Sequence, residues 1–517
     1  MKSRIDNSIR NTTFAIIGQI GTIVLSFLTR TIFIACLGAS YLGINGLFTN
    51  ILSVLSFAEL GFGTAIVYAL YKPLAENNQK EVAAYMNFYA LVYRFVGIFI
   101  FVGGLALVPF LSYFIGDTSE IPSDIPPLWV IYILYLLNSS ASYFFNYKRS
   151  LITASQNGHI DSLNTLIFTF IRNIFQIVGL IVWRSFVFYL VVQIICTLLG
   201  NIAISLRANR LFPYLSKYKK ERLDSDSLHL IIRNVIAMAC HKLGSVIVSG
   251  TDNILISKFV GVVATGYYSN YTLITSTVRT FYLQLFSPIT ASVGNFIAEK
   301  GQDDRYYFFK KMFFVNAYIA IFCTACLSTL INPFITLLWG KQYVFSTVIV
   351  AFIMLNFYIT CMRQTTCIFI DTNGLFWQVK WKSVLEALIN LIASVLLAHY
   401  LNLGILGVII GTTISTVTTN FWWEPYVVFK DSLKVPLRNY FILYTEYTFV
   451  VIISVIAIEL FGLCLPITVS AFALRCLIAV IVPNVLIFIL FRKTSEYRYC
   501  ITIIKHFIDK ISKKSHD

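Results

Sequence analysis

Charged residues are scarce in this chain of 517 residues: Asp, Glu, Lys and Arg make up 12%, whereas 57% of the residues are hydrophobic. Globular domains carry about 25% charged residues, so a water-soluble fold is excluded for most of the chain. Polar stretches long enough for a soluble domain are also missing, because only short loops separate the apolar runs. About 20 apolar residues cross a hydrocarbon core, so the sequence predicts an all-α polytopic membrane protein.

Signatures of catalysis and metal binding are missing as well. The sequence contains no G-x-x-x-x-G-K-[ST] phosphate loop, no H-E-x-x-H and only 6 histidines. The 10 cysteines suggest no disulfide framework, and the C-x-x-C of Cys323 and Cys326 lies inside an apolar run without a further ligand at metal-binding spacing. We therefore expect no enzyme activity, no metal site and no cofactor.

What is present is a series of fourteen apolar runs that predict about 14 transmembrane helices. They cover residues 12–37, 42–70, 83–111, 127–147, 161–182, 186–206, 231–258, 266–297, 312–337, 344–370, 383–401, 404–429, 442–463 and 467–491. With both termini in the cytoplasm, only Arg184 and Lys341 fall in external loops, and the longest of these, 112–126, has no base. The positive-inside rule explains this bias and the net charge of +16, so nucleic acid is not an expected partner.

One segment of the chain occurs twice. When the sequence is shifted by 223 residues, 38–79 aligns with 261–302 without a gap, and 10 of the 42 positions are identical. Each copy begins at a pair of glycines, continues as a long apolar run and ends in Ala-Glu-x-x-Gln, which predicts a turn, a span and a loop. The copies are six spans apart, so the two halves have the same orientation, related by a pseudo-two-fold axis along the membrane normal.

The repeat divides the chain into two parallel six-helix lobes, at 1–206 and 231–429. Residues 207–230 form a cytoplasmic linker, 430–491 contribute two C-terminal helices outside the repeat, and 492–517 form a basic cytoplasmic tail. Isoleucines at positions 501, 504, 508 and 511 recur at helical spacing in the tail. The tail is therefore either an amphipathic helix on an anionic inner leaflet or a solvated extension.

Ionisable residues inside the spans are the candidate functional groups, because they are costly in hydrocarbon and generally face an interior or a water-filled cavity. The acids Glu59, Asp252 and Glu424 either couple transport to an ion or hold the arginines, and Glu424 also fits an interfacial anchor. Both halves supply bases, each of which binds substrate or forms an interhelical ion pair. A cavity between the halves would be cationic and suit an anionic ligand, because Arg binds phosphate oxygens bidentately. The candidate bases are Arg30, Arg94, Arg172, Lys242, Arg279 and Arg363.

Short motifs in both halves occur in an order and spacing that resemble bacterial polysaccharide flippases of the multidrug/oligosaccharidyl-lipid/polysaccharide exporter superfamily. The first half contains Thr29-Arg30, Leu37-Gly38-x-x-x-x-Gly43-Ile44-x-Gly46-Leu47-Phe48, Leu55-Ser56-x-x-Glu59-Leu60-Gly61-Phe62-Gly63 and Tyr71-Lys72-Pro73-Leu74-Ala75. The second half contains Thr251-Asp252-Asn253-Ile254-Leu255-Ile256-Ser257 and Gly266-Tyr267-Tyr268-Ser269. The resemblance covers nearly the whole chain.

The resemblance implies a multi-pass protein of the bacterial cytoplasmic membrane that exports O-antigen, capsule or teichoic-type repeat units. Its substrate would be an undecaprenyl-diphosphate-linked oligosaccharide, flipped to the outer leaflet by alternating access and driven by H⁺ or Na⁺. On this hypothesis Arg30, Arg94 and Arg279 clamp the diphosphate, and Asp252 or Glu59 takes up the ion. Membrane lipids, a polysaccharide polymerase and other assembly proteins would be its partners.

Three other functions fit parts of the sequence. A multidrug extruder of the same superfamily would transport cationic compounds, for which an acid-dominated interior is expected. A polysaccharide polymerase or ligase would carry a large external loop with catalytic residues, whereas 112–126 is short and acidic. A non-transporting scaffold of the assembly complex is the third alternative.

Overall fold

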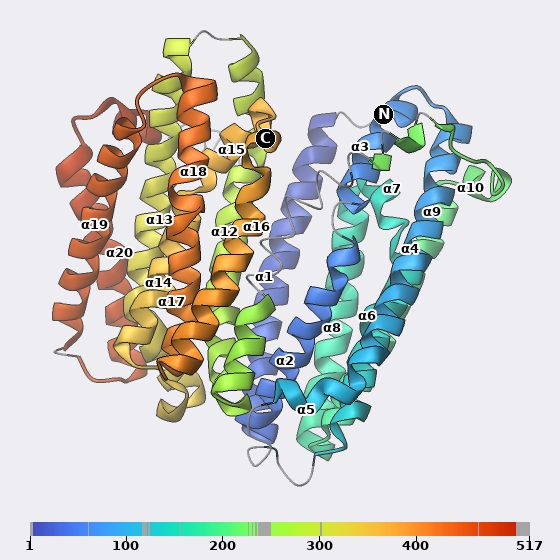
Figure 1. The fold of residues 1–517 in the computed structure, drawn as a ribbon, viewed down its shortest axis with the longest axis horizontal. Coiled ribbons are helices and arrows are strands. Elements are labelled where there is room, and N and C mark those ends of the chain that lie inside the picture. The colour runs from blue at the N-terminus through green and yellow to red at the C-terminus, as the bar shows by residue number, and fades with distance from the viewer. Residues whose placement is uncertain are drawn as a thin grey trace, which may run out of the picture. The chain divides into compact units, whose positions relative to one another are not determined.

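The computed structural model describes residues 4–502 apart from 60–61, 116–120, 122–124, 156, 226, 230, 233–234, 236–249, 300–301 and 464. Over these residues the elements are helices joined by turns, and no strand is present (Figure 1). Internal contacts divide the chain into two compact units, Met1–Ser269 and Asn270–Asp517. This division falls inside a helix, whereas the sequence placed the lobe boundary in the linker 207–230; the predicted lobe boundaries stay a prediction.

The first unit is a bundle of long helices in which α8 packs against α1 and α9, and α6 packs against α4 and α9. The long helices are α1 (Arg4–Leu37), α2 (Ala39–Leu55), α3 (Phe62–Ala75), α4 (Gln79–Leu107), α6 (Leu128–Asn146), α8 (Gly158–Trp183) and α9 (Phe186–Leu211). Short elements join them: η1 (Ser56–Glu59), η2 (Val108–Phe110), α5 (Leu111–Phe114), α7 (Arg149–Ala154) and α10 (Tyr214–Lys217).

The second unit is built around α13, which packs against α14, α19 and α20, while α17 packs against α14 and α16. Its long helices are α12 (Val262–Glu299), α13 (Gln302–Trp339), α14 (Thr347–Met362), α16 (Phe376–Val395), α17 (Gly404–Thr418), α19 (Arg438–Leu463) and α20 (Val469–Phe491). The shorter elements are η4 (Lys341–Tyr343), α15 (Gln364–Asn373), η5 (Leu396–Tyr400), α18 (Asn420–Val427) and η6 (Val428–Leu433).

Local chemistry explains several helix boundaries. Asn78 caps α4: its Oδ1 accepts from the backbone N–H of Glu81 at 3.3 Å, and its Nδ2 donates back to the Glu81 carboxylate at 2.9 Å. Thr468 caps α20 through its hydroxyl in the same way. Gly374 ends α15 with a φ of 67°, a left-handed conformation that is least costly for glycine.

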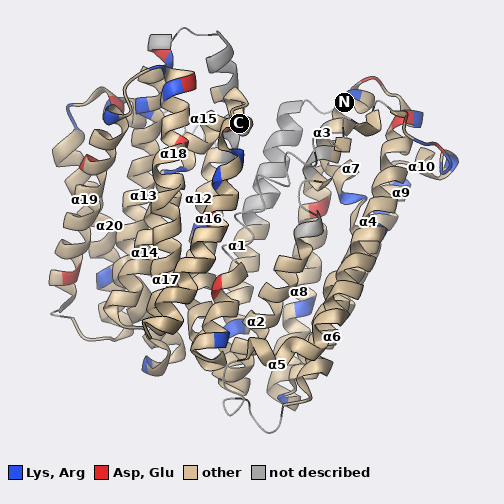
Figure 2. Ribbon diagram, viewed as in Figure 1, with Lys and Arg blue, Asp and Glu red and all other residues tan. Residues whose placement is uncertain are grey.

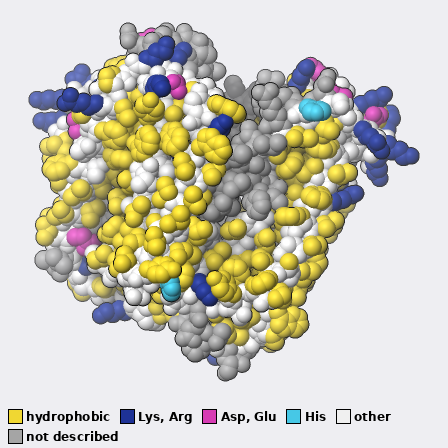
Figure 3. Space-filling model, viewed as in Figure 1, with side chains coloured by type: hydrophobic (Ala, Val, Ile, Leu, Met, Phe, Trp, Pro, Cys, Tyr) yellow, Lys and Arg dark blue, Asp and Glu magenta, His cyan; other side chains and the backbone are white. Residues whose placement is uncertain are grey.

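Eleven helical stretches in the described residues are long and apolar enough to cross a membrane. The chain is thus a multi-pass membrane protein, as the composition predicted. The eleven correspond to all the predicted spans except the second, seventh and eighth, so the count of fourteen is not established. Most of the seventh, at 231–258, lies outside the described residues. In both units hydrophobic side chains cover the helices between their ends (Figure 3), while Lys and Arg gather at the ends (Figure 2).

The repeated segment has the predicted turns and loops. Gly38 and Gly261 both have positive φ, 87° and 131°, and each precedes a helix. The polar motif also recurs, because Gln79 begins α4 and Gln302 begins α13. The two copies differ in between: the described residues of the first form α2, η1 and α3, whereas the second is the continuous helix α12. The predicted span 42–70 stays a prediction. The first copy has Gly61 and Gly63 where the second has Gln284 and Phe286, and glycine disfavours an uninterrupted helix.

The first turns of α2 and α12 cross closely and symmetrically. A Cβ on Gly43 would lie 1.8 Å from the carbonyl oxygen of Val262, and a Cβ on Gly266 would lie 2.5 Å from that of Ala39. Gly43 and Gly266 are equivalent in the repeat, as are Ala39 and Val262, so each contact is the image of the other. Small residues permit this approach, as they do in membrane helix pairs. The contact agrees with the predicted pseudo-two-fold relationship.

Candidate substrate and coupling site

Arg30 lies on α1, where its neighbours fix its position. Its guanidinium donates to the hydroxyl of Ser269, and Tyr135 and Tyr189 lie within electrostatic range. The adjacent Thr29 is buried and donates to Oδ1 of Asn173 at 2.6 Å, which joins α1 to α8. Arg30 is therefore in contact with a serine hydroxyl and close to two tyrosines.

Glu59 occupies a position at which the two repeats differ in charge. Its carboxylate accepts a hydrogen bond from the hydroxyl of Tyr93. The shift of 223 residues relates Glu59 to Tyr282 and, beyond the repeated segment, Tyr93 to Asn316. The hydroxyl of Tyr282 donates to the Asn316 amide oxygen. The same contact thus uses an ionisable acceptor in the first half and a neutral acceptor in the second.

Aromatic rings surround Glu59. The rings of Tyr89 and Tyr93 are 4.3 Å apart between centroids, and those of Tyr93 and Tyr143 are 5.6 Å apart. Asp252, the other candidate acid of the first unit, is only 7% exposed and lies 3.4 Å from the hydroxyl of Tyr268. Tyrosine hydroxyls therefore contact both acids.

In the second unit the candidate residues Arg363 and Glu424 form a bidentate ion pair. Arg363 donates from Nε to Oε2 at 2.8 Å and from its terminal nitrogen to Oε1 at 2.7 Å. Lys382 also contacts Oε1, so one carboxylate serves two bases. The side chains of Lys382 and Glu424 are 4% and 2% exposed. Glu424 is therefore buried in an ion pair with Arg363. An interfacial anchor would need no such partner.

A second polar contact lies next to this ion-pair cluster. The amide of Asn420 donates to Oε1 of Glu386, and both side chains are buried. Glu386 and Lys382 are four residues apart on α16 and share a helix face. Lys382, Glu386 and Asn420 were not predicted as site residues, although the four-residue spacing of the lysine and the glutamate is apparent in the sequence.

Each of the remaining candidate bases has its own surroundings. Arg94 lines a cavity of about 960 Å³ together with Lys148 and residues that follow α9. Arg172 and Arg149 line a cavity of about 240 Å³ formed by residues of α6, α8 and α9, where Arg149 also pairs with Asp161 at 3.2 Å. Arg279 is exposed on α12, within electrostatic range of Arg363.

One candidate base and the cysteines remain among the predicted interior residues. Lys242 lies outside the described residues. The eight described cysteines are free thiols, and Sγ of Cys326 donates to the carbonyl oxygen of Ala479 at 3.4 Å. No group of three or more His, Cys, Asp or Glu that could hold a metal occurs in the searched part of the chain.

Comparisons with known proteins identify the fold. No family model and no curated protein matches the sequence. Among solved structures, the lipid II flippase MurJ in an inward closed conformation has a TM-score of 0.63 at 18% identity, covering 94% of this chain and 99% of its own. An inward-facing multidrug resistance MATE family transporter of the MOP superfamily has a TM-score of 0.62 at 15% identity, covering 78% and 94%.

A MOP superfamily transporter from Pyrococcus furiosus, described by the reverse polarity of its binding pocket, matches with a TM-score of 0.57 at 15% identity, covering 83% of this chain and 96% of its own. This chain has the MOP transporter fold. The fold agrees with the resemblance drawn from the motifs, and membership of the superfamily and of the polysaccharide flippase family remains a prediction. The similar structures are described as transporters and a flippase, and the absence of enzyme activity in this chain remains a prediction.

Proposed function

We propose that this protein flips an undecaprenyl-diphosphate-linked oligosaccharide from the inner to the outer leaflet of a bacterial cytoplasmic membrane for surface polysaccharide synthesis. The two lobes would alternate access to a central cationic cavity, with H⁺ or Na⁺ as the coupling ion. The fold supports a transporter, and the interior charges support an anionic substrate.

The observation that carries the proposal is the charge balance inside the helices. Glu424 is shared by Arg363 and Lys382, and the adjacent Glu386 interacts with both bases, so this cluster is balanced when all four groups are ionised. Arg172 and Arg279 form no ion pair with a carboxylate in the described part of the chain. A diphosphate offers the oxygen acceptors and negative charge that guanidinium groups bind most strongly.

We assign ion coupling to Glu59, with Asp252 as the alternative residue. Glu59 is the position where the first repeat has a carboxylate and the second has a tyrosine. Uptake of a proton or Na⁺ would change the charge that accepts from Tyr93, while the equivalent neutral contact of Tyr282 would not respond. Such an asymmetry lets one lobe sense the ion gradient.

The proposal is tested in proteoliposomes with a fluorescent undecaprenyl-diphosphate saccharide, whose exposure is followed by quenching from outside. We expect wild-type protein to flip the probe and Arg30→Glu combined with Arg279→Glu to reduce the rate at least about tenfold, since a clamping base becomes a repelling acid. Lys341→Glu, which reverses a charge in a predicted external loop, is the matched control. Wild-type rates in the double variant would refute the clamp.

The same vesicles distinguish the multidrug alternative. Ethidium, a cationic aromatic probe, should not be transported by the wild-type protein, because interior bases repel it. Ethidium transport without flipping of the diphosphate probe would instead assign the chain to drug extrusion.

A further inference from the structure

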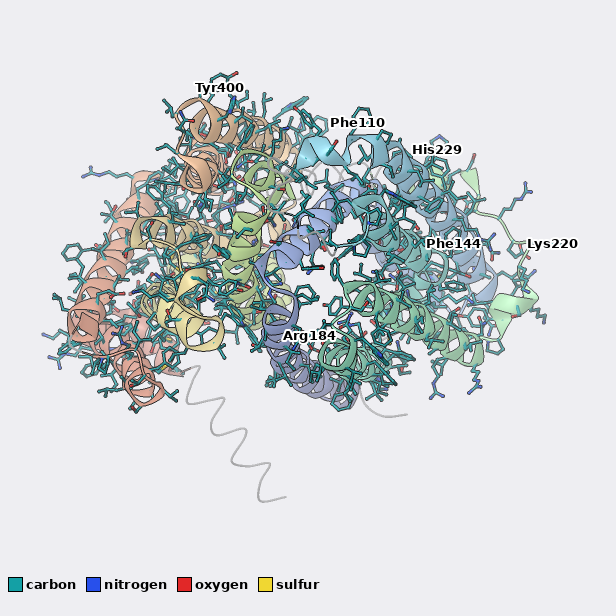
Figure 4. The ribbon with its side chains drawn as sticks, turned by 90° about the horizontal axis from the view of Figure 1, so that it is seen from below. Phe110, Phe144, Arg184, Lys220, His229 and Tyr400 are labelled. Carbon is teal, nitrogen blue, oxygen red and sulfur yellow. The ribbon has the colours of Figure 1, made fainter. Side chains whose placement is uncertain are left out.

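Arg94 lines a cavity whose ionisable residues are mostly bases. The cavity measures about 960 Å³ and lies in the first unit, between α4 and the segment that follows α9. Five bases line it, against the single carboxylate of Glu221 among its lining residues. The five are Arg94, Lys148, Lys219, Lys220 and Arg222. Lys220 lies at the margin of the unit, near α10 (Figure 4).

Hydrogen bonds hold the walls of this cavity in place. The amide of Asn87 on α4 donates to the carbonyl oxygens of Tyr218 and Glu221, at 2.9 and 3.0 Å. Nζ of Lys148 donates to Oδ1 of Asn209 on α9 at 2.8 Å. The backbone of the segment after α9 is thereby fixed to α4, on which Arg94 lies.

The bases of the cavity repel one another. Burial lowers the pKa of Lys148, and the charge of Lys219 lowers it further. An anion bound among these side chains would oppose both effects on the pKa, because a nearby negative charge stabilises the charged form of Lys148. The volume matches that of small-molecule sites, which are commonly about 300–1,000 Å³.

One wall of the cavity continues into a face suited to lipid. Leu91, which lines the cavity, is 65% exposed, and Phe95 and Ile98 are 67% and 54% exposed. With Arg94 they follow the i, i+3, i+4, i+7 spacing of one helix face. Arg94 precedes Phe114, the end of the stretch Gln79–Phe114, by 20 residues (114 − 94). If the span ends at Phe114, these residues correspond to about 30 Å of helix, the thickness of the hydrocarbon core, and Arg94 would lie at a membrane boundary.

We propose that the cavity binds the phosphate headgroup of an anionic phospholipid, whose acyl chains lie along the exposed apolar face of α4. Leu91 both lines the cavity and belongs to that exposed apolar face, which favours a membrane lipid over a soluble phosphate. The site is independent of the proposed flippase activity, because it involves a resident lipid and not the transported one.

The test measures phospholipid binding to delipidated full-length protein by native mass spectrometry. We expect phosphatidylglycerol to bind at least about tenfold more tightly than phosphatidylcholine, since several bases face the headgroup. Arg94→Gln combined with Lys219→Gln and Lys220→Gln should remove this preference. Lys430→Gln, Lys434→Gln and Arg438→Gln together remove the same number and type of charges from exposed positions of the second unit and should leave it intact.

Three results would overturn the proposal. The first is an unchanged phosphatidylglycerol preference in the triple variant at Arg94. The second is competition by inorganic phosphate or glycerophosphoglycerol as effective as that of the intact lipid, which would indicate a soluble anion. The third is displacement of phosphatidylglycerol by undecaprenyl diphosphate, which would make the cavity a substrate site. If the triple variant unfolds, Lys219→Gln with Lys220→Gln should still weaken binding by about threefold.

Discussion

Gly43 on α2 and Val262 on α12 approach so closely that no side chain fits between them: a Cβ on Gly43 would lie 1.8 Å from the Val262 carbonyl oxygen. The equivalent pair in the repeat, Gly266 and Ala39, leaves 2.5 Å. Because the obstacle is backbone, relief requires the two helices to separate. The crossing therefore depends on glycine at both positions.

Gly43→Ala should destabilise the protein by about 1–3 kcal/mol or more, the cost of overpacking a close contact. Thermal unfolding of purified protein in detergent measures this effect. Gly158→Ala is the matched control, because a Cβ at Gly158 meets nothing within 4 Å. Equal melting temperatures for Gly43→Ala and wild type would show that α2 and α12 do not cross as described.

The cluster around Glu424 should respond unequally to removal of its members. Glu424→Gln leaves Arg363 and Lys382 without their shared carboxylate, and breaking a buried pair in this way costs about 3–5 kcal/mol. Lys382→Met leaves the bidentate Arg363–Glu424 pair and should cost less. The exposed Glu446→Gln serves as control in the same thermal assay. A smaller loss in Glu424→Gln than in Lys382→Met would contradict the shared-carboxylate description.

Glu59→Gln should preserve the fold, because the Gln carbonyl can still accept from Tyr93, as Asn316 accepts from Tyr282. Flipping should nevertheless lose its dependence on an imposed H⁺ or Na⁺ gradient. The measurement is the ratio of flipping rates with and without the gradient, and Glu446→Gln should retain the wild-type ratio. A gradient response that survives in Glu59→Gln would assign coupling elsewhere, with Asp252→Asn as the next variant.

Acid should loosen the segment after α20 through Glu496. Burial by itself raises the pKa of Glu496, but the hydrogen bond and charge of Lys310, at 3.0 Å, outweigh it and lower the pKa. A carboxyl group with a lowered pKa contributes stability above its unfolded pKa, about 4.3, and loses it as pH falls through the folded value. The melting-temperature difference between wild type and Glu496→Gln should therefore shrink below about pH 4.3. A difference independent of pH would contradict this role.

The sequence predicted those features that depend on local pattern. The apolar runs predicted the helices, and the matched glycines predicted the turns at Gly38 and Gly261, because positive φ is a local property that glycine supplies at little cost. The break in the first copy was missed, since an apolar run does not show whether a helix continues through Gly61 and Gly63.

The grouping of charges was harder to predict. Arg363 and Glu424 are 61 residues apart and meet only through the packing of the second unit, and Lys382 was assigned to a loop at the edge of a span. Arg94 was grouped with Arg30 and Arg279 because all three are bases within spans. The structure places Arg94 beside Lys148 and the segment after α9, and its grouping with Arg30 and Arg279 stays a prediction. Depth along a helix can be counted from sequence, but the face that a side chain occupies depends on the neighbouring helices.

The central claim, recognition of a lipid-linked diphosphate by interior bases, is tested most directly by varying the headgroup charge alone. Wild-type proteoliposomes are given the same fluorescent saccharide linked to undecaprenol through a diphosphate or through a monophosphate. We predict that the diphosphate probe flips at least about tenfold faster, because it accepts more charge-assisted hydrogen bonds from arginine. Equal rates for the two probes, or faster flipping of the monophosphate, would contradict the claim.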